Sequence, residues 1–192
     1  MAKKVLIGVD HIPENVERTV QAIYNYAPSS VGLELPEDYE EREKLGLTVS
    51  FFDDIVCSLR EDEIKVVYLE NPEAIDYFRS VNLAKLIVEG HVSKEEIHCE
   101  LLYLKKINVA YMSPETIFEL IVQKKRYGEA LDLVTHNDLD NIILLWEQTN
   151  HRREAHMKKN IKSYNPDVIV IGDAHAQEIT TALPDYEYIA IK

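Results

Sequence analysis

Cysteine is scarce in this sequence, with only Cys57 and Cys99 among 192 residues. The two lack a close Cys-x-x-Cys spacing, and both lie in helix-like sequence. A chain of this length can bury a substantial core without disulfides. We therefore expect both cysteines to be buried or partly buried thiols of a reducing compartment.

Long apolar runs are also missing. No stretch approaches the roughly 20 apolar residues that a membrane-spanning helix needs. The N-terminal Met-Ala-Lys-Lys is followed by only five apolar or small residues before Asp10, which is too few for a secretory signal. We expect a cytoplasmic protein that does not interact with membranes. The length predicts a single domain over residues 1–192.

Positive charge is the third scarce feature, because 21 basic residues face 34 acidic ones and the net charge is −13. This balance argues against nonspecific binding of nucleic acid or of anionic membranes, since both require concentrated positive charge. It is compatible with cationic ligands, including divalent metals. The expected partner is a small molecule or a peptide, and a homo-oligomer stays possible.

Short apolar runs rich in β-branched residues predict buried strands. Their nearly continuous hydrophobicity is typical of strands covered on both faces. We therefore predict an α/β domain whose sheet is mixed but mostly parallel, with helices on both faces. The predicted strands are Val5–Val9, Val31–Leu35, Lys65–Leu69, Val168–Ile171 and Tyr188–Ile191, with Val109–Met112 as a weaker candidate.

Helices are predicted between these strands. One begins at Pro13, and capping signals start others at Ser93 and at Ser113. Further helices are predicted over residues 48–60, 73–89 and 138–163. The acidic stretch Pro36–Lys44 is predicted to be an exposed loop.

One tetrapeptide pattern occurs twice. Gly8–His11 and Gly172–His175 are both Gly-x-x-His, and each follows a predicted strand and precedes a predicted helix and a second strand. Each chain end therefore resembles a βαβ unit with parallel strands. The carboxyl ends of such strands are the edge where open α/β sheets bind ligands.

The two histidines are the first candidates for a functional site. A glycine at a strand end allows a tight turn and the close approach of a ligand, which makes Gly8 and Gly172 candidate binding positions. The positive end of a helix dipole disfavours imidazolium, so we expect His11 and His175 to be neutral. Neutral imidazole binds metals and accepts protons. The alternative is that each histidine caps its helix or bonds a neighbouring carbonyl.

Glu34 is the third candidate, because it stands near the end of an otherwise apolar strand. A buried carboxylate is costly unless it is paired or bound to metal. Its strand is expected to neighbour the strand of His11. The alternative is that Glu34 already lies in solvent, as the nearby Pro36 suggests.

Arg153 lies on the apolar stripe of the long C-terminal helix, at spacings of three and four residues from Asn150 and Met157. An inward guanidinium requires a carboxylate or an anionic ligand. The alternative is that the side chain extends along the helix to reach water.

Three further side chains are weaker candidates. Asp10 and Asp173 flank the histidines and are candidate metal or ligand contacts, and His156 is one helical turn from Arg153. The sequence has no His-Glu-x-x-His, phosphate-loop or Gly-x-Ser-x-Gly motif. The Gly8–His11 segment also lacks the later glycines of a dinucleotide fingerprint.

These features resemble the TraB/PrgY, GumN and Tiki group, which is related to the erythromycin esterases and to the haem-binding ChaN-like proteins. The resemblance depends on the order of Gly8–His11, Val31–Leu35, Arg153 with Met157, and Gly172–His175. It implies an α/β fold in which both Gly-x-x-His motifs and the glutamate meet at one site. The sequence departs from the group in having no arginine soon after the glutamate, since Arg42 is the nearest. Residues 45–135 carry nothing of the pattern.

Carried over from the resemblance, His11 and His175 are candidate metal ligands or bases, and Glu34 is a candidate ligand or general base. Asp173, which flanks His175, is a further candidate ligand, and the expected ion is zinc, manganese or cobalt. The same resemblance makes His11, Glu34, His175 and Arg153 the candidate catalytic residues. The leading hypothesis is a divalent-metal-dependent peptidase, amidase or esterase. The alternative is a non-catalytic binding or signalling domain that uses the same residues to bind a peptide or haem.

Overall fold

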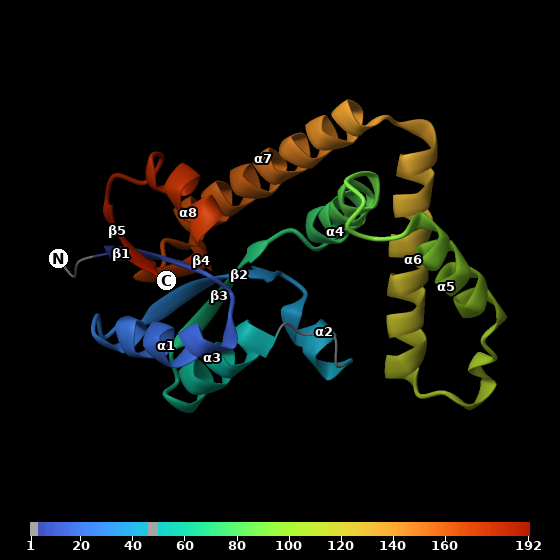
Figure 1. Ribbon diagram of the computed structural model, residues 1–192. Helices are drawn as coiled ribbons and strands as arrows, with labels where there is room; N and C mark the ends of the chain where they lie inside the picture. Colours follow the sequence, from blue (N-terminus) through green and yellow to red (C-terminus); the bar gives the residue numbers. More distant parts are fainter. Residues whose placement is uncertain (1–3, 46–49) are drawn as a thin grey trace. The chain divides into compact units, whose positions relative to one another are not determined.

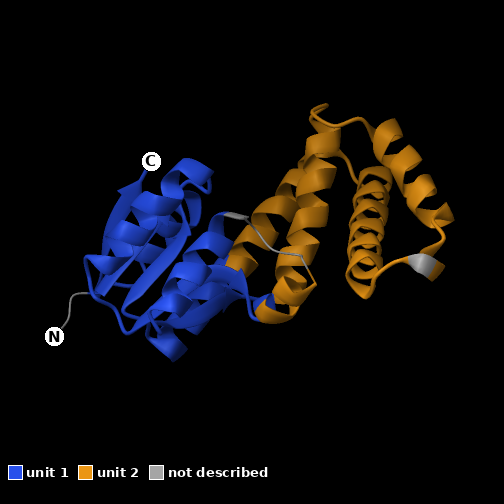
Figure 2. Ribbon diagram, turned by 90° about the horizontal axis from the view of Figure 1, so that it is seen from below, with its two compact units in different colours: residues 1–39, 48–71, 154–192 blue, residues 40–47, 72–153 orange. Residues whose placement is uncertain are grey.

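The computed structural model describes residues 4–45 and 50–192. Contacts along the chain divide it into two compact units, coloured separately in Figure 2. The α/β unit comprises residues 1–39, 48–71 and 154–192, and the helical unit comprises residues 40–47 and 72–153. The single-domain organisation stays a prediction, and residues 1–3 and 48–49, which entered the expectations above, lie outside the described part.

The α/β unit is built on five parallel strands in the order β3-β2-β4-β1-β5 (Figure 1). All five main strand predictions are confirmed to within about two residues at their ends. The predicted α/β fold is confirmed, and the sheet, which was expected to be mostly parallel, is parallel at every pairing of the described strands. The strands are β1 Lys4–Val9, β2 Ser30–Pro36, β3 Lys65–Glu70, β4 Val168–Gly172 and β5 Tyr186–Ile191.

Alternation along the strands places apolar side chains on both faces of the sheet. In β1, Val5 and Ile7 pack into a core with α1 (Val16–Tyr24) and α3 (Ser50–Glu61), which cover one face of the sheet. Leu6, which lies between them, points to the other face and packs with Met157 of α7 (Leu139–Tyr164) and with α8 (Asp173–Thr180). This two-sided burial explains why the strands read as continuous apolar runs.

The two chain ends interleave within this sheet. β4 lies between β1 and β2, and β1 lies between β4 and β5. The strands of each expected βαβ unit are therefore parallel but not adjacent. The expectation that the strand of Glu34 neighbours the strand of His11 is wrong, because β4 separates β2 from β1. The order of the strands in the sheet is decided by tertiary packing, which a single sequence does not encode locally.

The helical unit packs around a core that includes Ala84, Ala130 and Ile142. Two of its helices start as their capping signals predict. The Ser93 hydroxyl accepts a hydrogen bond from the Glu96 amide, and the Ser113 hydroxyl accepts one from Thr116. The helices are α2 Tyr39–Lys44, α4 Pro72–Val88, α5 Lys94–Lys106, α6 Pro114–His136 and the first part of α7, with a 3₁₀ turn at Val109–Tyr111.

The acidic stretch predicted to be an exposed loop forms α2 instead. Tyr39 at its start is buried, and its hydroxyl donates a 2.6 Å hydrogen bond to Asp53. Arg42 is also buried and donates two hydrogen bonds to Asp76, at 3.0 and 2.9 Å. These two anchors hold a segment whose composition alone favours solvent.

Two smaller expectations are also wrong. The weak strand candidate at residues 109–112 is a 3₁₀ turn capped by the Asn108 side chain, which accepts a hydrogen bond from the Ala110 amide. Cys57 and Cys99 are exposed rather than buried. Each lies on the outward side of its helix, two residues after the buried Ile55 and Ile97. Among the described helices, none combines the length and the apolar character needed to cross a membrane.

Candidate functional site

The two Gly-x-x-His segments meet at one edge of the sheet. Because β1 and β4 are paired in parallel, with Val9 opposite Gly172, both segments leave the carboxyl ends of adjacent strands. The helices that follow them, α1 and α8, pack on opposite faces. Neighbouring strands whose connections leave toward opposite faces open the crevice in which α/β proteins bind ligands.

Glu34 reaches this edge from β2, on the other side of β4. Its side chain is only 7% exposed, so the possibility that it lies in solvent is excluded. The amide of Gly172 donates a 2.6 Å hydrogen bond to Glu34 Oε2. A buried carboxylate requires such donors, and this one fixes the glutamate directly against the second Gly-x-x-His turn.

His175 lies in the first turn of α8, where its two ring nitrogens face two different carboxylates. Nδ1 is 2.9 Å from Glu154 Oε1, and Nε2 is 3.7 Å from Glu34 Oε1. Glu154 comes from α7 and is itself buried. A carboxylate on one imidazole nitrogen fixes the ring orientation and leaves the other nitrogen to act.

His11 lies in the loop after β1, and its Nε2 is 3.9 Å from Glu34 Oε2. Its ring stacks on Phe51, with centroids 5.1 Å apart, and meets the edge of Phe52 at 4.7 Å. Both phenylalanines are buried. The side chain is 31% exposed, so this imidazole is oriented by aromatic packing while part of it remains open to solvent.

Neither histidine is the N-cap of the helix that follows it. Ile12 occupies that position for the 3₁₀ turn at Pro13–Asn15, and Gly172 occupies it for α8. Capping, the first part of the alternative, is therefore wrong, while a bond from either ring to a neighbouring carbonyl is left untested. Instead, two imidazoles and one buried carboxylate face each other at separations beyond hydrogen-bonding range.

Gly8 and Gly172 permit this close packing, although they differ in how much space they leave. A Cβ added at Gly172 would lie 3.2 Å from Glu34 Oε2 and 3.5 Å from His11 Cε1. At Gly8 it would lie 2.6 Å from Asp173 Oδ1 and 2.9 Å from the Ala176 Cβ. Gly8 thus serves the packing of β1 against α8, whereas Gly172 lies directly at the site.

The two aspartates of the motifs have different surroundings. Asp173 accepts a hydrogen bond from the Tyr188 hydroxyl of β5. Burial, that hydrogen bond and the carboxylate charge raise the pKa of Tyr188 to about 12. Asp10 is exposed, and its backbone carbonyl accepts a hydrogen bond from Asn15.

His156 belongs to a second cluster in the α/β unit. Its Nε2 lies 3.1 Å from Glu37 Oε1 and 3.0 Å from the Asn160 amide nitrogen. Hydrogen bonds from Asn160 and His156 lower the pKa of Glu37. The carboxylate that His156 contacts is therefore Glu37 and not Glu34.

Arg153 is buried, as its place on the helix stripe predicts. Its guanidinium lies 4.4 Å from the ring centroid of Phe78, and it donates a 3.5 Å hydrogen bond to Asn150. All three residues belong to the helical unit. The role of Arg153 at the histidine site stays a prediction.

The donors can be compared with the needs of a metal ion. A tetrahedral ion with bonds of 2.0–2.1 Å holds its donor atoms about 3.4 Å apart. The two imidazole-to-Glu34 separations, 3.7 and 3.9 Å, are a few tenths of an ångström wider. In the described part of the chain no three His, Cys, Asp or Glu side chains are already gathered as ligands. Both separations thus exceed the donor spacing of a tetrahedral site, and Asp173 is engaged by Tyr188.

Three residues of the site escaped the sequence prediction: Glu154, Phe51 and Phe52. Glu154 had a readable signal, because Asn150, Glu154, Met157 and Ile161 follow spacings of four, three and four residues. The inward stripe of the long helix includes Glu154 as well as Arg153. Phe51 and Phe52 had no such signal, since aromatic residues at a helix start are ordinary core residues.

Comparison of the chain with protein-family models, with curated proteins and with solved structures finds no match. The likeness to the TraB, GumN and Tiki group therefore stays an expectation from the four short segments, and functional inference depends on the geometry of the site.

Proposed function

We propose that the protein is a divalent-metal-dependent hydrolase of a peptide, amide or ester, with its centre at His11, Glu34 and His175. One observation carries the proposal. Two imidazole Nε2 atoms face the oxygens of one buried carboxylate at 3.7 and 3.9 Å. Electron-pair donors that converge at this spacing favour a cation between them.

The surrounding residues would hold these donors in place. Glu154 accepts the Nδ1 proton of His175, which directs the Nε2 lone pair toward Glu34. The Gly172 amide fixes Glu34 Oε2. Phe51 and Phe52 restrict the ring of His11 and cover one side of it. Preorganised donors of this kind lose little entropy when a ligand binds.

The ion would be held by His11 Nε2, His175 Nε2 and Glu34. The chemistry that such an ion supplies when bound is a water whose pKa approaches about 7. Glu154 would be a positioning residue rather than a ligand. Arg153 enters the proposal only through the family resemblance, as a holder of an anionic substrate group.

The test combines metal uptake with hydrolysis. Chelator-treated protein would be titrated with zinc, manganese and cobalt by calorimetry, and then assayed on ester, amide and peptide substrates. We expect about one ion per chain, and we expect His11→Ala and His175→Ala to abolish uptake while circular dichroism stays unchanged. Glu154→Gln should weaken affinity by about 10- to 100-fold, as loss of an outer-shell carboxylate does.

His98→Ala is the matched control, because His98 is an exposed histidine on α5, and it should bind the ion as the wild type does. Stoichiometric metal in folded His11→Ala protein would overturn the metal site. Turnover that survives complete chelation would overturn metal dependence alone. A metal-bound protein without turnover, or a visible absorption band on haem titration, would favour the binding domain instead.

A further inference from the structure

Two helices of the helical unit line a small, partly open cavity of about 30 Å³. α4 contributes Asp76, Arg79 and Ser80, and α6 contributes Val122, Lys125, Arg126 and Glu129. Three of these seven side chains are cationic, in a protein whose net charge is −13. A local excess of positive charge in an otherwise acidic protein attracts anions to that place.

The two carboxylates of the cavity already have partners. Both oxygens of Asp76 accept hydrogen bonds from Arg42, at 3.0 and 2.9 Å. Glu129 Oε2 accepts a 2.7 Å hydrogen bond from the Ser80 hydroxyl. This bidentate pair and this hydroxyl bond leave little carboxylate capacity for the remaining cations.

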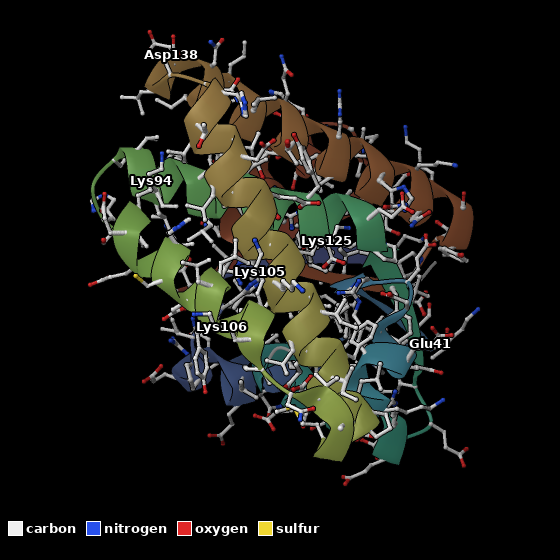
Figure 3. All side chains as sticks on the ribbon, turned by 90° about the vertical axis from the view of Figure 1, so that its right-hand side faces the viewer. Glu41, Lys94, Lys105, Lys106, Lys125 and Asp138 are labelled. Atoms are coloured by element: carbon white, nitrogen blue, oxygen red, sulfur yellow. The ribbon has the colours of Figure 1, made fainter. Side chains whose placement is uncertain are left out.

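Arg79 and Arg126 are the two arginines of the cavity that have no hydrogen bond to either carboxylate. Arg79 Nη1 is 3.8 Å from Asp76 Oδ1, beyond hydrogen-bonding range. Within residues 4–45 and 50–192, neither guanidinium donates a hydrogen bond, and Arg126 has no ion pair. Lys125, labelled in Figure 3, is 3.9 Å from Glu129 Oε1.

The like charges oppose one another. Burial lowers the pKa of Arg79, and the nearby charges of Arg42, Arg126 and Arg153 lower it further, while Asp76 opposes the decrease. An arginine stays protonated under ordinary conditions, so the cost remains as repulsion. The cavity lining thus carries three cations, Arg79, Lys125 and Arg126, against two carboxylates, and one of these carboxylates, Asp76, is also bound by Arg42.

We propose that the cavity between α4 and α6 is a binding site for a phosphate-type dianion, held by Arg79, Arg126 and Lys125. Two guanidinium groups from facing helices suit the several oxygens of a phosphate group, because each presents a planar fork of donors. A dianion offsets the repulsion among these three cations more fully than a singly charged anion does. The cavity is small and partly open to solvent, so only the anionic group enters and the rest of a larger ligand stays outside.

The test is calorimetric titration of the full chain with inorganic phosphate at low ionic strength, followed by methyl phosphate and acetate. We expect phosphate to bind and acetate to bind at least tenfold more weakly, because a carboxylate carries half the charge. Arg126→Gln should weaken phosphate binding by roughly tenfold or more, the loss expected for charge-assisted hydrogen bonds. Lys125→Gln should weaken it less, since a lysine acts as a point charge.

Arg152→Gln is the matched control, because Arg152 is an exposed arginine of the same unit that lies outside the cavity. It should bind phosphate within about twofold of the wild type. Equal losses in Arg126→Gln and Arg152→Gln, or no phosphate binding by the wild type, would overturn the site. Methyl phosphate that binds as tightly as phosphate would assign the site to phosphorylated molecules, and much weaker binding would assign it to free phosphate. Arg126→Gln and Arg152→Gln both change exposed side chains and should fold. The test therefore does not require a substitution at the more buried Arg79.

Discussion

The two Gly-x-x-His segments share a sequence pattern, a strand before them and an edge of the sheet, yet their histidines are held differently. His175 stands in a helical turn with a buried carboxylate on Nδ1. His11 stands in a loop and is oriented by two phenylalanine rings. A repeated motif therefore predicts where a side chain lies, but not which interactions orient it.

The two motifs should differ most in how their first glycines tolerate substitution. Gly8→Ala should lower the free energy of unfolding by about 2–3 kcal/mol, since the new methyl group meets Ala176 at 2.9 Å inside a packed layer. Gly172→Ala should cost less than about 1 kcal/mol, because its nearest contact is 3.2 Å. Urea denaturation of both variants measures the difference, and equal losses would contradict the distinction.

The next test concerns the partner of His175. A double-mutant cycle with His175→Ala and Glu154→Ala should give a coupling free energy of about 2 kcal/mol, as for a hydrogen bond to a charged group. His156 and Glu37 provide the control cycle. Their side chains are 24% and 45% exposed, so their coupling should be below about 1 kcal/mol. A weaker coupling at Glu154 than at Glu37 would sink the positioning role.

The aspartates of the two motifs lead to a third test. Tyr188→Phe removes the donor to Asp173 and should cost about 1 kcal/mol at neutral pH. Asp10→Asn, at the exposed aspartate of the first motif, should change stability by less than about 0.5 kcal/mol. Chemical denaturation at pH 7 measures both variants.

Tyr188 also predicts a dependence on pH. Its folded pKa of about 12 exceeds the usual 10.0, so the folded state retains the proton longer than the unfolded chain does. The resulting stability is fully present below pH 10 and is lost as the pH rises toward 12. Tyr188→Phe should reduce this loss without removing it, because Tyr24 and Tyr186 also have a pKa of about 12. An unchanged alkaline profile would show that Tyr188 ionises normally.

The smallest effect is expected at the first motif. The coupling free energy between His11 and Phe51, measured by a double-mutant cycle with His11→Ala and Phe51→Leu, should be about 0.5 kcal/mol. This value is the low end for stacked rings, since His11 is partly exposed. A coupling that equals the one between His175 and Glu154 would mean that the two histidines are held equally strongly.

The strands and two of the helix starts could be predicted from the sequence alone. The strands are visible because two-sided burial requires continuous apolar runs, as in Val168–Gly172. The capped starts at Ser93 and Ser113 are visible because capping is local. The prediction of an exposed loop at α2 was wrong, because Tyr39 and Arg42 are held by hydrogen bonds to residues 14 and 34 positions away. Their partners are Asp53 and Asp76.

Local sequence patterns specify the buried strands, the two glycine turns at their carboxyl ends and the inward stripe of the long helix. These features follow from side-chain periodicity and backbone freedom, which act over a few residues. Long-range packing, by contrast, places β4 between β1 and β2, brings the Gly172 amide to Glu34 and brings Glu154 to His175. Those contacts join residues 21 to 138 positions apart, and only packing of the whole chain selects them.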